Sequence, residues 1–337
     1  MANPPTPYFY TQLIREIRRG RVTPFLGAGV NLCGRPPNTE FQPGEWLPSG
    51  KELAEYLAKM FDYPKGLPID LLRVTQWVTV TLGPDTLYAQ LHEIFNWDYQ
   101  PTEMHKTLAK LPVFVKREMR PEYPLIITTN YDDALERALT AAGVEFDLLT
   151  YLAAGKDLGK FRHRDPDGNT TVIMVPNKYA AVSLKQRTVV VKIHGAVQRR
   201  ALGESLDNYV VTADDDIDDS YVVTEDDYID CLTRTDIVEL LPSAVVDRMR
   251  HCHYLFLGYS LQDWNLRAML YRIRRDQALG NASWVVQPDP EELEEKAWRY
   301  RKVDTLDITL EKFSRALDGW LPPAQTDAVG EGRLAAS

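Results

Sequence analysis

The sequence of 337 residues predicts an α/β protein whose core is a doubly wound, Rossmann-like parallel sheet with a helical insertion. Short strand-like runs alternate with helical segments through much of the chain, which is the order that successive βαβ units produce. Residues 63–123 instead carry mostly helical patterns, so we expect them to form the insertion. We expect one domain over residues 1–322, followed by a disordered tail or linker over residues 323–337.

The expected strands are short apolar runs bounded by glycine, proline or asparagine. Val22–Leu26 is the first, and it follows an amphipathic helix over residues 8–19. Residues 171–175 are expected to form an antiparallel edge strand, whereas the polar, glycine-containing residues 153–168 are expected to form a loop. The remaining strands are expected over residues 124–129, 145–151, 188–193, 253–257, 283–287 and 303–310.

The expected helices show apolar residues at helical spacing and capping residues at their ends. One begins at Ser49 or Gly50, after a loop rich in proline and glycine. Residues 208–223 are expected to form a hairpin or a long loop, and its acidic tip lacks the spaced glycine and terminal glutamate of an EF-hand. Further helices are expected over residues 86–95, 103–111, 131–142, 225–232, 241–250, 264–277 and 290–301, with a last one ending near residue 320.

Composition and charge restrict the class of protein. Hydrophobic residues make up 44% of the chain and charged residues 26%, which is typical of a globular protein. No run approaches the roughly 18 apolar residues of a membrane span, and the N-terminus lacks the layout of a secretory signal. We therefore expect a cytoplasmic protein that does not bind membranes. The net charge of −9 argues against a broad nucleic-acid-binding face, so no direct binding of nucleic acid is expected.

Cysteine usage bears on metal binding. The three cysteines, Cys33, Cys231 and Cys252, are far apart in the sequence and form no Cys-x-x-Cys pair. One chain therefore cannot supply the four cysteines of a structural zinc site, and we expect no bound metal. The small, odd number of cysteines also fits a reducing compartment.

Glycine or polar residues directly follow four of the expected strands. In an open parallel sheet, ligands bind beyond the carboxyl ends of the strands. Each motif alone is compatible with an ordinary turn, but their joint placement predicts one ligand-binding crevice. The four motifs are residues 27–29 (Gly-Ala-Gly), 129–132 (Thr-Asn-Tyr-Asp), 194–195 (His-Gly) and 258–260 (Gly-Tyr-Ser).

The turn formed by Gly27, Ala28 and Gly29 is suited to a phosphate. Glycines directly after a strand let backbone N–H groups approach a phosphate closely, and a following helix N-terminus adds partial positive charge. The dinucleotide fingerprint of dehydrogenases needs a third glycine, where this chain has Leu32. Hydride transfer is therefore disfavoured.

The four motifs together resemble the NAD-binding and catalytic motifs of sirtuins, in sirtuin order, over residues 22–287. This resemblance implies a sirtuin-type sheet. The zinc-ribbon cysteines of protein-deacylating sirtuins are absent, and Thr129 stands where a glutamine usually precedes the motif asparagine, Asn130. With residues 258–265, these departures resemble a bacterial sirtuin-like branch whose members degrade NAD in antiphage defence. The matching residues are 27–29, 128–132, 193–195 and 258–260.

The resemblance implies contacts along a bound NAD. The turn at residues 27–29 is expected to hold the pyrophosphate. Asn31 stands where sirtuins commonly have serine, and it is expected to reach a phosphate or a ribose hydroxyl. Gly258 and Ser260 are expected to approach the adenosine half or a phosphate.

Three side chains are candidates for the chemistry. Asn130 can donate and accept hydrogen bonds, so it is expected to hold the nicotinamide ribose or to orient water; it can also be a helix N-cap. Asp132 can accept from the nicotinamide carboxamide, as the matching sirtuin residue does, or it can be a first-turn acidic residue favoured by the helix dipole. His194 can act as a general base near neutral pH, and the other five histidines lie at no comparable strand end.

The resemblance implies hydrolysis of the nicotinamide–ribose bond of NAD, with nicotinamide and ADP-ribose as products. The positively charged nicotinamide is a good leaving group, so we expect an oxocarbenium-like transition state and no metal. Two alternatives stay open, an NAD-dependent protein deacylase and a non-catalytic module that senses NAD or ADP-ribose. We expect a homo-oligomer or assembly with a defence partner, such as an ATPase or a short Argonaute, or activation by a phage trigger.

Overall fold

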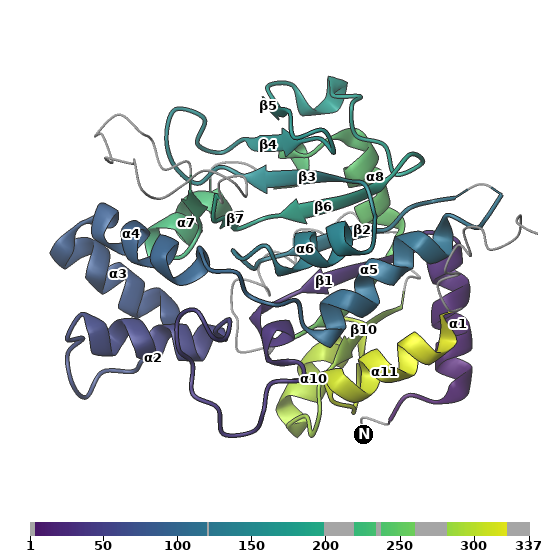
Figure 1. The fold of residues 1–337 in the computed structure, drawn as a ribbon. Coiled ribbons are helices and arrows are strands. Elements are labelled where there is room, and N and C mark those ends of the chain that lie inside the picture. Colours follow the sequence, from purple (N-terminus) through teal and green to yellow (C-terminus); the bar gives the residue numbers. More distant parts are fainter. Residues whose placement is uncertain (1–3, 120, 199–218, 234–236, 260–281, 322–337) are drawn as a thin grey trace, which may run out of the picture.

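The fold is built on one large sheet. The computed structural model describes residues 4–119, 121–198, 219–233, 237–259 and 282–321. The strands of the sheet are β1 (Val22–Leu26), β2 (Leu125–Thr128), β3 (Phe146–Tyr151), β4 (Phe161–Arg164), β5 (Thr170–Val172), β6 (Thr188–Lys192), β9 (His253–Leu257), β10 (Ser283–Val286) and β11 (Val303–Leu306). Their order is β11-β10-β9-β1-β2-β6-β3-β4-β5 (Figure 1). Neighbouring strands from β11 to β3 run parallel, and β4 and β5 are antiparallel additions at one edge, so the predicted sheet is confirmed.

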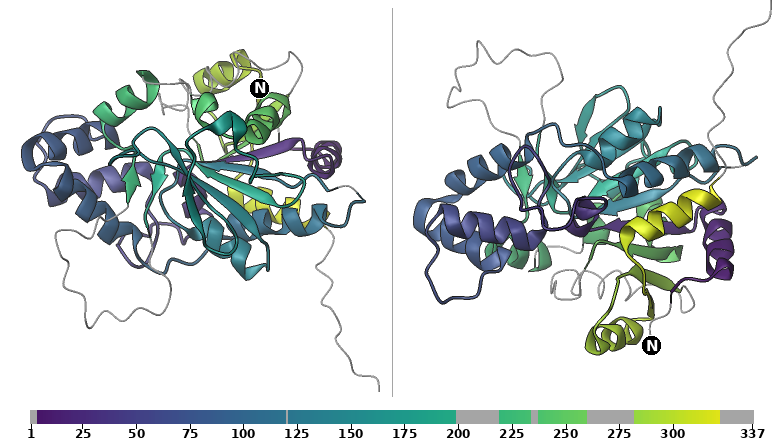
Figure 2. Two further views of the ribbon diagram at one scale, coloured as in Figure 1. Left: turned by 90° about the horizontal axis from the view of Figure 1, so that it is seen from above. Right: turned by 60° about the horizontal axis from the view of Figure 1, so that its bottom comes forward.

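The parallel strands are buried on both faces. Every residue of β1 and β6 is buried, and alternate side chains join two different hydrophobic clusters, as Phe25 and Leu26 do. A parallel sheet of this kind needs helices on both faces. The two faces are covered by different helices, as Figures 1 and 2 show. One face carries α1 (Pro7–Arg18), α5 (Glu103–Val115), α6 (Ala134–Ala141) and α11 (Leu310–Trp320), and the other carries α8 (Ser243–His251) and α10 (Glu292–Tyr300).

Three further helices form a group at the carboxyl ends of the parallel strands (Figure 1). These helices, called the helical group below, are α2 (Gly50–Met60), α3 (Leu71–Leu82) and α4 (Pro84–Phe95). Their hydrophobic cluster draws on residues 47–99 and also takes in Tyr131 and Tyr221 from the sheet side. The insertion expected over residues 63–123 is thus divided, because α2 packs with this group whereas α5 packs on the sheet against α6 and α11.

Local hydrogen bonds account for where two helices begin. The predicted start of α2 is confirmed by a capping box, in which Ser49 Oγ accepts from Glu52 N–H at 3.2 Å and Glu52 accepts from Ser49 N–H at 2.9 Å. α6 begins three residues later than the predicted residue 131. The reason is that Asp132 Oδ1 accepts a hydrogen bond from Ala134 N–H at 3.0 Å, which makes a turn before the helix.

Two predictions about strands are wrong in detail. The loop expected over residues 153–168 contains β4, whose four residues alternate between a buried face, with Phe161 and His163, and a more exposed one. A two-residue alternation this short, in a polar segment, gives little signal in the sequence. The strand expected over residues 303–310 ends at Leu306, because Thr309 already caps α11.

The remaining elements are short. They are η1 (Ala28–Leu32), η2 (Pro176–Lys178), β7 (Gly195–Ala196), β8 (Ser220–Tyr221), α7 (Glu225–Thr233) and η4 (Ile237–Leu240). β7 and β8 pair as a separate antiparallel sheet of two strands. The predictions for residues 208–218, 264–277 and 323–337 lie outside the described residues, as does Ser260.

None of the helices in the described ranges is long and apolar enough to cross a membrane.

Candidate functional site

The four motifs that follow strands meet at one edge of the sheet. β9, β1, β2 and β6 are neighbours and run parallel, so the last residues of these strands stand side by side. The predicted convergence of the four strand ends is therefore confirmed. In the sheet, β1 lies between β2, which is the next strand along the chain, and β9, which comes much later in the sequence. This is a topological switch point, where open α/β sheets bind their ligands.

The glycines at the β1–β9 junction allow two backbones to approach closely. Gly27 N–H donates to Leu257 O, and Gly29 N–H donates to Gly258 O, each at 3.0 Å. A Cβ on Gly258 would lie 2.3 Å from Val30 N, so only glycine fits at that position. The N–H groups of Gly27 and Gly29 are therefore both bonded to the β9 turn, and the expectation that the turn at residues 27–29 holds a pyrophosphate stays a prediction.

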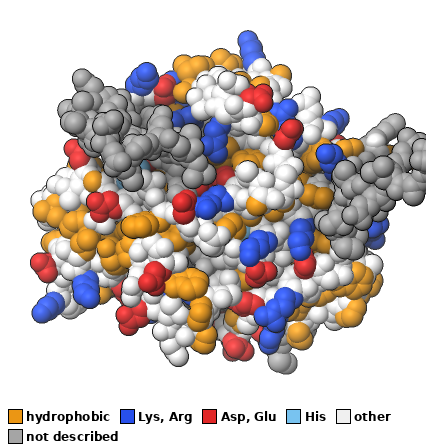
Figure 3. All heavy atoms as spheres, in the orientation of Figure 1, with side chains coloured by type: hydrophobic (Ala, Val, Ile, Leu, Met, Phe, Trp, Pro, Cys, Tyr) orange, Lys and Arg blue, Asp and Glu red, His pale blue; other side chains and the backbone are white. Residues whose placement is uncertain are grey.

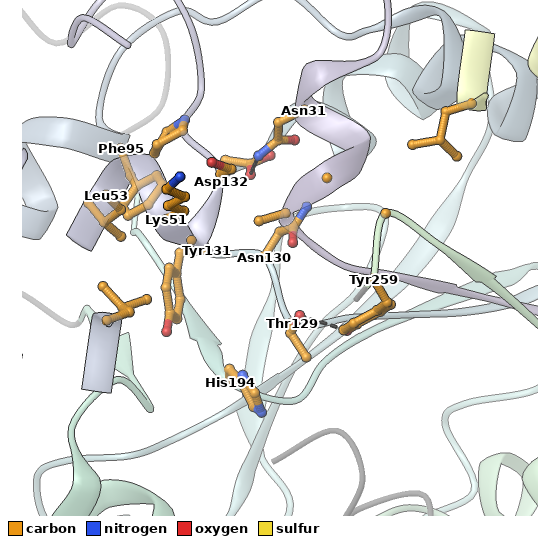
Figure 4. A pocket seen from close by; sticks show the side chains of 18 of the residues that line it. Asn31, Lys51, Leu53, Phe95, Thr129, Asn130, Tyr131, Asp132, His194 and Tyr259 are labelled. Carbon is orange, nitrogen blue, oxygen red and sulfur yellow. Dashed lines mark hydrogen bonds between the residues drawn. The ribbon is translucent and has the colours of Figure 1, made fainter. Parts of the chain in front are cut away.

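A cavity of about 480 Å³ opens beside this junction. Gly27 lies in the adjoining turn but does not line the cavity, and Ser260 is outside the described residues. The helical group supplies the opposite wall, with Leu53 and Phe95 among its side chains (Figure 4). The predicted site residues that line the cavity are Ala28, Gly29, Asn31, Asn130, Asp132, His194 and Gly258.

Asn130 follows β2 and is 8% exposed. Its backbone N–H donates to Thr128 Oγ1 at 3.0 Å, and its Nδ2 donates to Gly27 O at 3.4 Å. The N-cap residue of α6 is Asp133, so Asn130 does not cap that helix. The buried Oδ1 of Asn130 has no hydrogen-bond partner among the described residues. The side chain is therefore fixed by its amide nitrogen and keeps its oxygen for another donor.

Asp132 and Asn31 form a pair across the cavity wall (Figure 4). Asn31 Nδ2 donates to Asp132 Oδ2 at 3.2 Å, while Asp132 Oδ1 accepts from the N–H of Ala134. Burial raises the pKa of the Asp132 carboxyl, and the positive charge of Lys192 opposes that shift. Asp132 thus forms the turn before α6 and lines the cavity at the same time. Asn31 Oδ1 is buried and, within the part of the chain that the structure describes, unpartnered.

His194 follows β6 and is 6% exposed. Its Nδ1 lies 3.2 Å from the hydroxyl oxygen of Tyr228, and the two rings meet edge to face with centroids 5.2 Å apart. Burial lowers the pKa of His194 to about 3. The imidazole is therefore neutral at physiological pH and can accept a hydrogen bond, although it is a weaker base than the sequence predicts.

A buried ion pair, which the sequence analysis missed, supports the motif after β2. Lys192 Nζ lies 2.8 Å from Glu136 Oε1 and also donates to the backbone oxygens of Tyr131 and Asp132. Lys192 is 1% exposed, so these partners take the place of water around its amine. The pair holds the segment that carries Asn130. The signal that could have revealed it is a lysine inside the otherwise apolar run over residues 188–193.

Tyr259 and Lys51 also line the cavity without having been predicted as site residues. The Tyr259 hydroxyl donates to Leu26 O at 3.0 Å and lies 2.7 Å from Thr129 Oγ1, so it ties the β2 and β9 ends across β1. Lys51 lies in the first turn of α2, and it is the one lysine or arginine among the described residues that line the cavity. Lys51 lies in a different segment of the chain from the four motifs, so nothing in the sequence connects it with them.

The cysteines lie on different sides of the sheet. Cys33 belongs to the hydrophobic cluster under α1 and α5, whereas Cys252 and Cys231 contact the cluster on the opposite face. Burial raises the pKa of the Cys33 and Cys252 thiols to about 11, so both stay protonated. In the described ranges, no three His, Cys, Asp or Glu side chains are grouped as metal ligands would be.

A protein-family model for the SIR2-like domain matches residues 124–306, which is more than half of the chain. The matched range runs from β2 to β11 and includes Asn130, Asp132, His194 and Gly258. No curated protein matches the chain.

Proposed function

The chain belongs to the SIR2-like domain family, and on that premise we propose that it is an NAD hydrolase of a branch without a zinc module. Proteins of this family are NAD-dependent enzymes, and SIR2-like domains bind NAD. The proposed reaction cleaves the nicotinamide–ribose bond and releases nicotinamide and ADP-ribose. The observation that carries the proposal is the cavity beside the β1–β9 junction, in which Asn130 and Asn31 each keep an unpartnered, buried side-chain oxygen among the described residues.

These two oxygens make the cavity complementary to hydrogen-bond donors. A buried polar atom without a partner costs roughly 1–3 kcal/mol, so native structures keep few of them. An amide oxygen can only accept, and the ribose hydroxyls and the carboxamide N–H groups of NAD are donors. A bound NAD would therefore satisfy Asn130 Oδ1 and Asn31 Oδ1, which supports NAD as the ligand.

The order of the strands gives the crevice a length that suits the ligand. His194 follows β6 and Gln287, which also lines the cavity, follows β10; four strand spacings of about 4.8 Å separate these strands, or about 19 Å. This length suits a dinucleotide laid along the strand ends. We place the nicotinamide ribose at His194 and Asn130, the pyrophosphate beside Ala28, and the adenosine toward Gln287.

The proposed chemistry uses neutral side chains. The nicotinamide nitrogen leaves with the electron pair of its bond to the ribose and becomes neutral, while positive charge develops on the ribose ring. Water adds to the anomeric carbon and loses its proton toward the neutral imidazole of His194. The oxygen of Asn130 accepts a hydrogen bond from the water or from a ribose hydroxyl. The side chains of Asn130 and His194 are only 8% and 6% exposed, so their dipoles are little screened by bulk water.

The positions of the cysteines favour hydrolysis over protein deacylation. In the sirtuins that deacylate proteins, a zinc ribbon joins two lobes of the molecule, as the resemblance implies. Here Cys33 and Cys252 belong to hydrophobic clusters on opposite faces of the sheet. Their side chains therefore cannot bind one zinc ion without refolding the core.

We propose further that the enzyme acts in the cytoplasm as an antiphage effector that depletes NAD, and that it works as a homo-oligomer or with a defence partner. Its activity would then have to be switched on by a trigger. Exposed apolar side chains on the helical group support a contact surface there (Figure 3). Large apolar side chains that are about half exposed or more on this group and on the connection between α2 and α3 are Met60, Leu67, Ile69, Val80 and Leu82.

The direct test is to incubate the purified full chain with NAD and to identify the products by liquid chromatography and mass spectrometry. The same reactions should contain candidate triggers, including phage lysates, and an acetylated peptide. We expect nicotinamide and ADP-ribose in equal amounts, and no deacetylated peptide. The matched controls are Asn130→Ala and His194→Ala. Formation of O-acetyl-ADP-ribose together with deacetylated peptide would instead establish the deacylase, and NAD binding without turnover under all conditions would establish a sensor.

A further inference from the structure

We infer that Tyr228 is the positioning residue of His194, and that its hydroxyl oxygen accepts the Nδ1 proton so that Nε2 is left as the proton acceptor. The consequence of this arrangement for turnover rests on the proposed function. The tautomer of the ring does not, because it is a property of the protein without substrate.

The contact between the two side chains is specific. The Tyr228 hydroxyl oxygen lies 3.2 Å from His194 Nδ1, and the ring planes are inclined by 89°. This is the one side-chain hydrogen bond of His194 with the described residues. Both side chains line the same cavity, so Tyr228 contacts a group that would face a bound ligand.

One short segment holds His194 at two points. Val222 N–H donates to the backbone oxygen of His194 at 2.9 Å, and Tyr228 reaches the imidazole from six residues further along. Between them, the Asp227 carboxylate accepts from Val223 N–H at 3.1 Å and from Thr224 N–H at 2.9 Å. These bonds fix the start of α7 and hence the position of the Tyr228 ring.

The helical group anchors this segment from the other side. Thr75 Oγ1 in α3 donates to Val223 O at 2.8 Å, and Gln76 exchanges two hydrogen bonds with Asp226, at 2.7 and 3.2 Å. The placement of α3 therefore determines where Tyr228 stands. A sequence pattern cannot show this link, because α3 and α7 are about 150 positions apart in the chain.

The proposed tautomer of His194, with its proton on Nδ1, follows from the requirement that a base has a nitrogen free to accept a proton. A neutral imidazole carries one proton, and only the nitrogen without it can accept another. If Tyr228 donated to Nδ1, the proton of the ring would be on Nε2 and that atom could not act as a base. A phenol oxygen can accept as well as donate, so Tyr228 can hold the proton at Nδ1. Tyr228 has the role here that a carboxylate or a carbonyl oxygen often has beside other functional histidines.

The first measurement uses the wild-type chain. Nitrogen-15 NMR of histidine-labelled protein, with His194→Gln to assign the signals, reports which ring nitrogen is protonated. We expect Nδ1–H in the wild type and a shift toward Nε2–H in Tyr228→Phe. A wild-type ring protonated at Nε2 would overturn the inference whether or not the protein hydrolyses NAD.

The second measurement compares two tyrosine variants. Tyr228→Phe should lower kcat about 10-fold and leave KM within about twofold, since the loss is one oriented hydrogen bond in the chemical step. The matched control is Tyr88→Phe, which removes a hydroxyl that donates to Tyr221 O at 3.3 Å and does not line the cavity. We expect wild-type kcat for that control. An unchanged kcat in Tyr228→Phe would overturn the inference, whereas a protein that shows the tautomer shift but cleaves no NAD would keep it and refute the proposed function.

Discussion

Two buried histidines of this protein differ in how completely their rings are hydrogen-bonded. His163, in β4, is 4% exposed; its Nε2 lies 3.0 Å from Asp147 Oδ1 and its Nδ1 lies 2.7 Å from the Tyr179 hydroxyl. Arg187 adds a second contact to the same carboxylate oxygen, at 3.1 Å. His194 is buried to a similar degree, but among the described side chains its ring is hydrogen-bonded to Tyr228 alone and has no carboxylate partner.

This difference in hydrogen bonding distinguishes a histidine that stabilises the fold from one that is available to a ligand. Both ring nitrogens of His163 are bonded within the protein, so nothing is left for a ligand, and the network joins β3, β4 and the segment before β6. His194 lies in a cavity with Asn130, whose Oδ1 is also unpartnered in the described part of the chain. Proteins that bind ligands keep incompletely bonded polar groups where the ligand completes them, at a cost in stability.

The largest expected effect is the loss of turnover in Asn130→Ala and His194→Ala. Removal of a general base typically costs roughly 10²- to 10⁴-fold in rate, and residues that act as a unit are non-additive. We therefore expect each variant to lose at least 10²-fold in NAD cleavage, and the double variant to be little worse than the worse single one. Calorimetry should show that NAD still binds, since the rest of the cavity is intact. Near wild-type turnover in both single variants would contradict the proposed site.

The opposite outcome is expected for the His163 network. Asp147→Ala leaves His163 and Arg187 without their buried carboxylate, so we expect a loss of roughly 2–4 kcal/mol in the free energy of unfolding. Turnover per folded molecule should stay at the wild-type level. Urea denaturation gives the stability, and the matched control is Asp167→Ala, which removes an exposed carboxylate in the turn after the same strand and should leave the midpoint nearly unchanged. A stable Asp147→Ala variant that has lost turnover would reverse the assignment of the two histidines.

A smaller effect is expected from pH. Burial lowers the pKa of His194 to about 3 and that of His105 to about 4. The unfolded chain takes up these protons near pH 6.5 and the folded chain does not, so stability should fall as the pH drops below about 6.5 and level off near pH 3–4. His194→Gln should flatten this dependence by up to about 1.4 kcal/mol per pH unit.

The measurement is the urea midpoint of wild type and His194→Gln at several pH values between 7.5 and 4.5. Other titrating groups contribute to both curves, so the difference between the curves isolates His194. Parallel curves would show that the imidazole of His194 is not held neutral by burial.

The sequence was sufficient to predict the strands that build the site, because a buried parallel strand is a short apolar run and a strand end is marked by glycine or a polar residue. Val22–Leu26 and the run before Asn130 are such cases, and both lie in the sheet as predicted. β4 was missed, since its alternation of buried and exposed residues covers only four positions. The limits of the helical group were also missed, because periodicity shows that a segment is helical but not which layer it packs against.

Contacts within the site depend on the fold and could not be predicted. The N–H groups of Gly27 and Gly29 are bonded to the β9 turn, which becomes visible only when β1 and β9 are known to be neighbours. Tyr228 and Lys51 come from segments far from the four motifs. The sequence therefore predicts which strand ends meet, whereas the partners of each side chain come from the packing of distant segments.

The smallest expected effect concerns Thr129, which lines the cavity in the position where a glutamine is usual in sirtuins. Its hydroxyl lies 2.7 Å from the Tyr259 hydroxyl and 3.4 Å from Leu26 O, so it is bonded within the protein like the ring of His163. We therefore expect Thr129→Val to behave as a structural change, with a loss of about 1 kcal/mol in the free energy of unfolding and turnover within about threefold of wild type. Thr129→Ser, which keeps the hydroxyl, is the matched control. A loss of turnover of more than about 10-fold in Thr129→Val at unchanged stability, with Thr129→Ser active, would show that a fully bonded side chain takes part in the chemistry. Incomplete hydrogen bonding would then no longer distinguish the functional residues of this cavity from the structural ones.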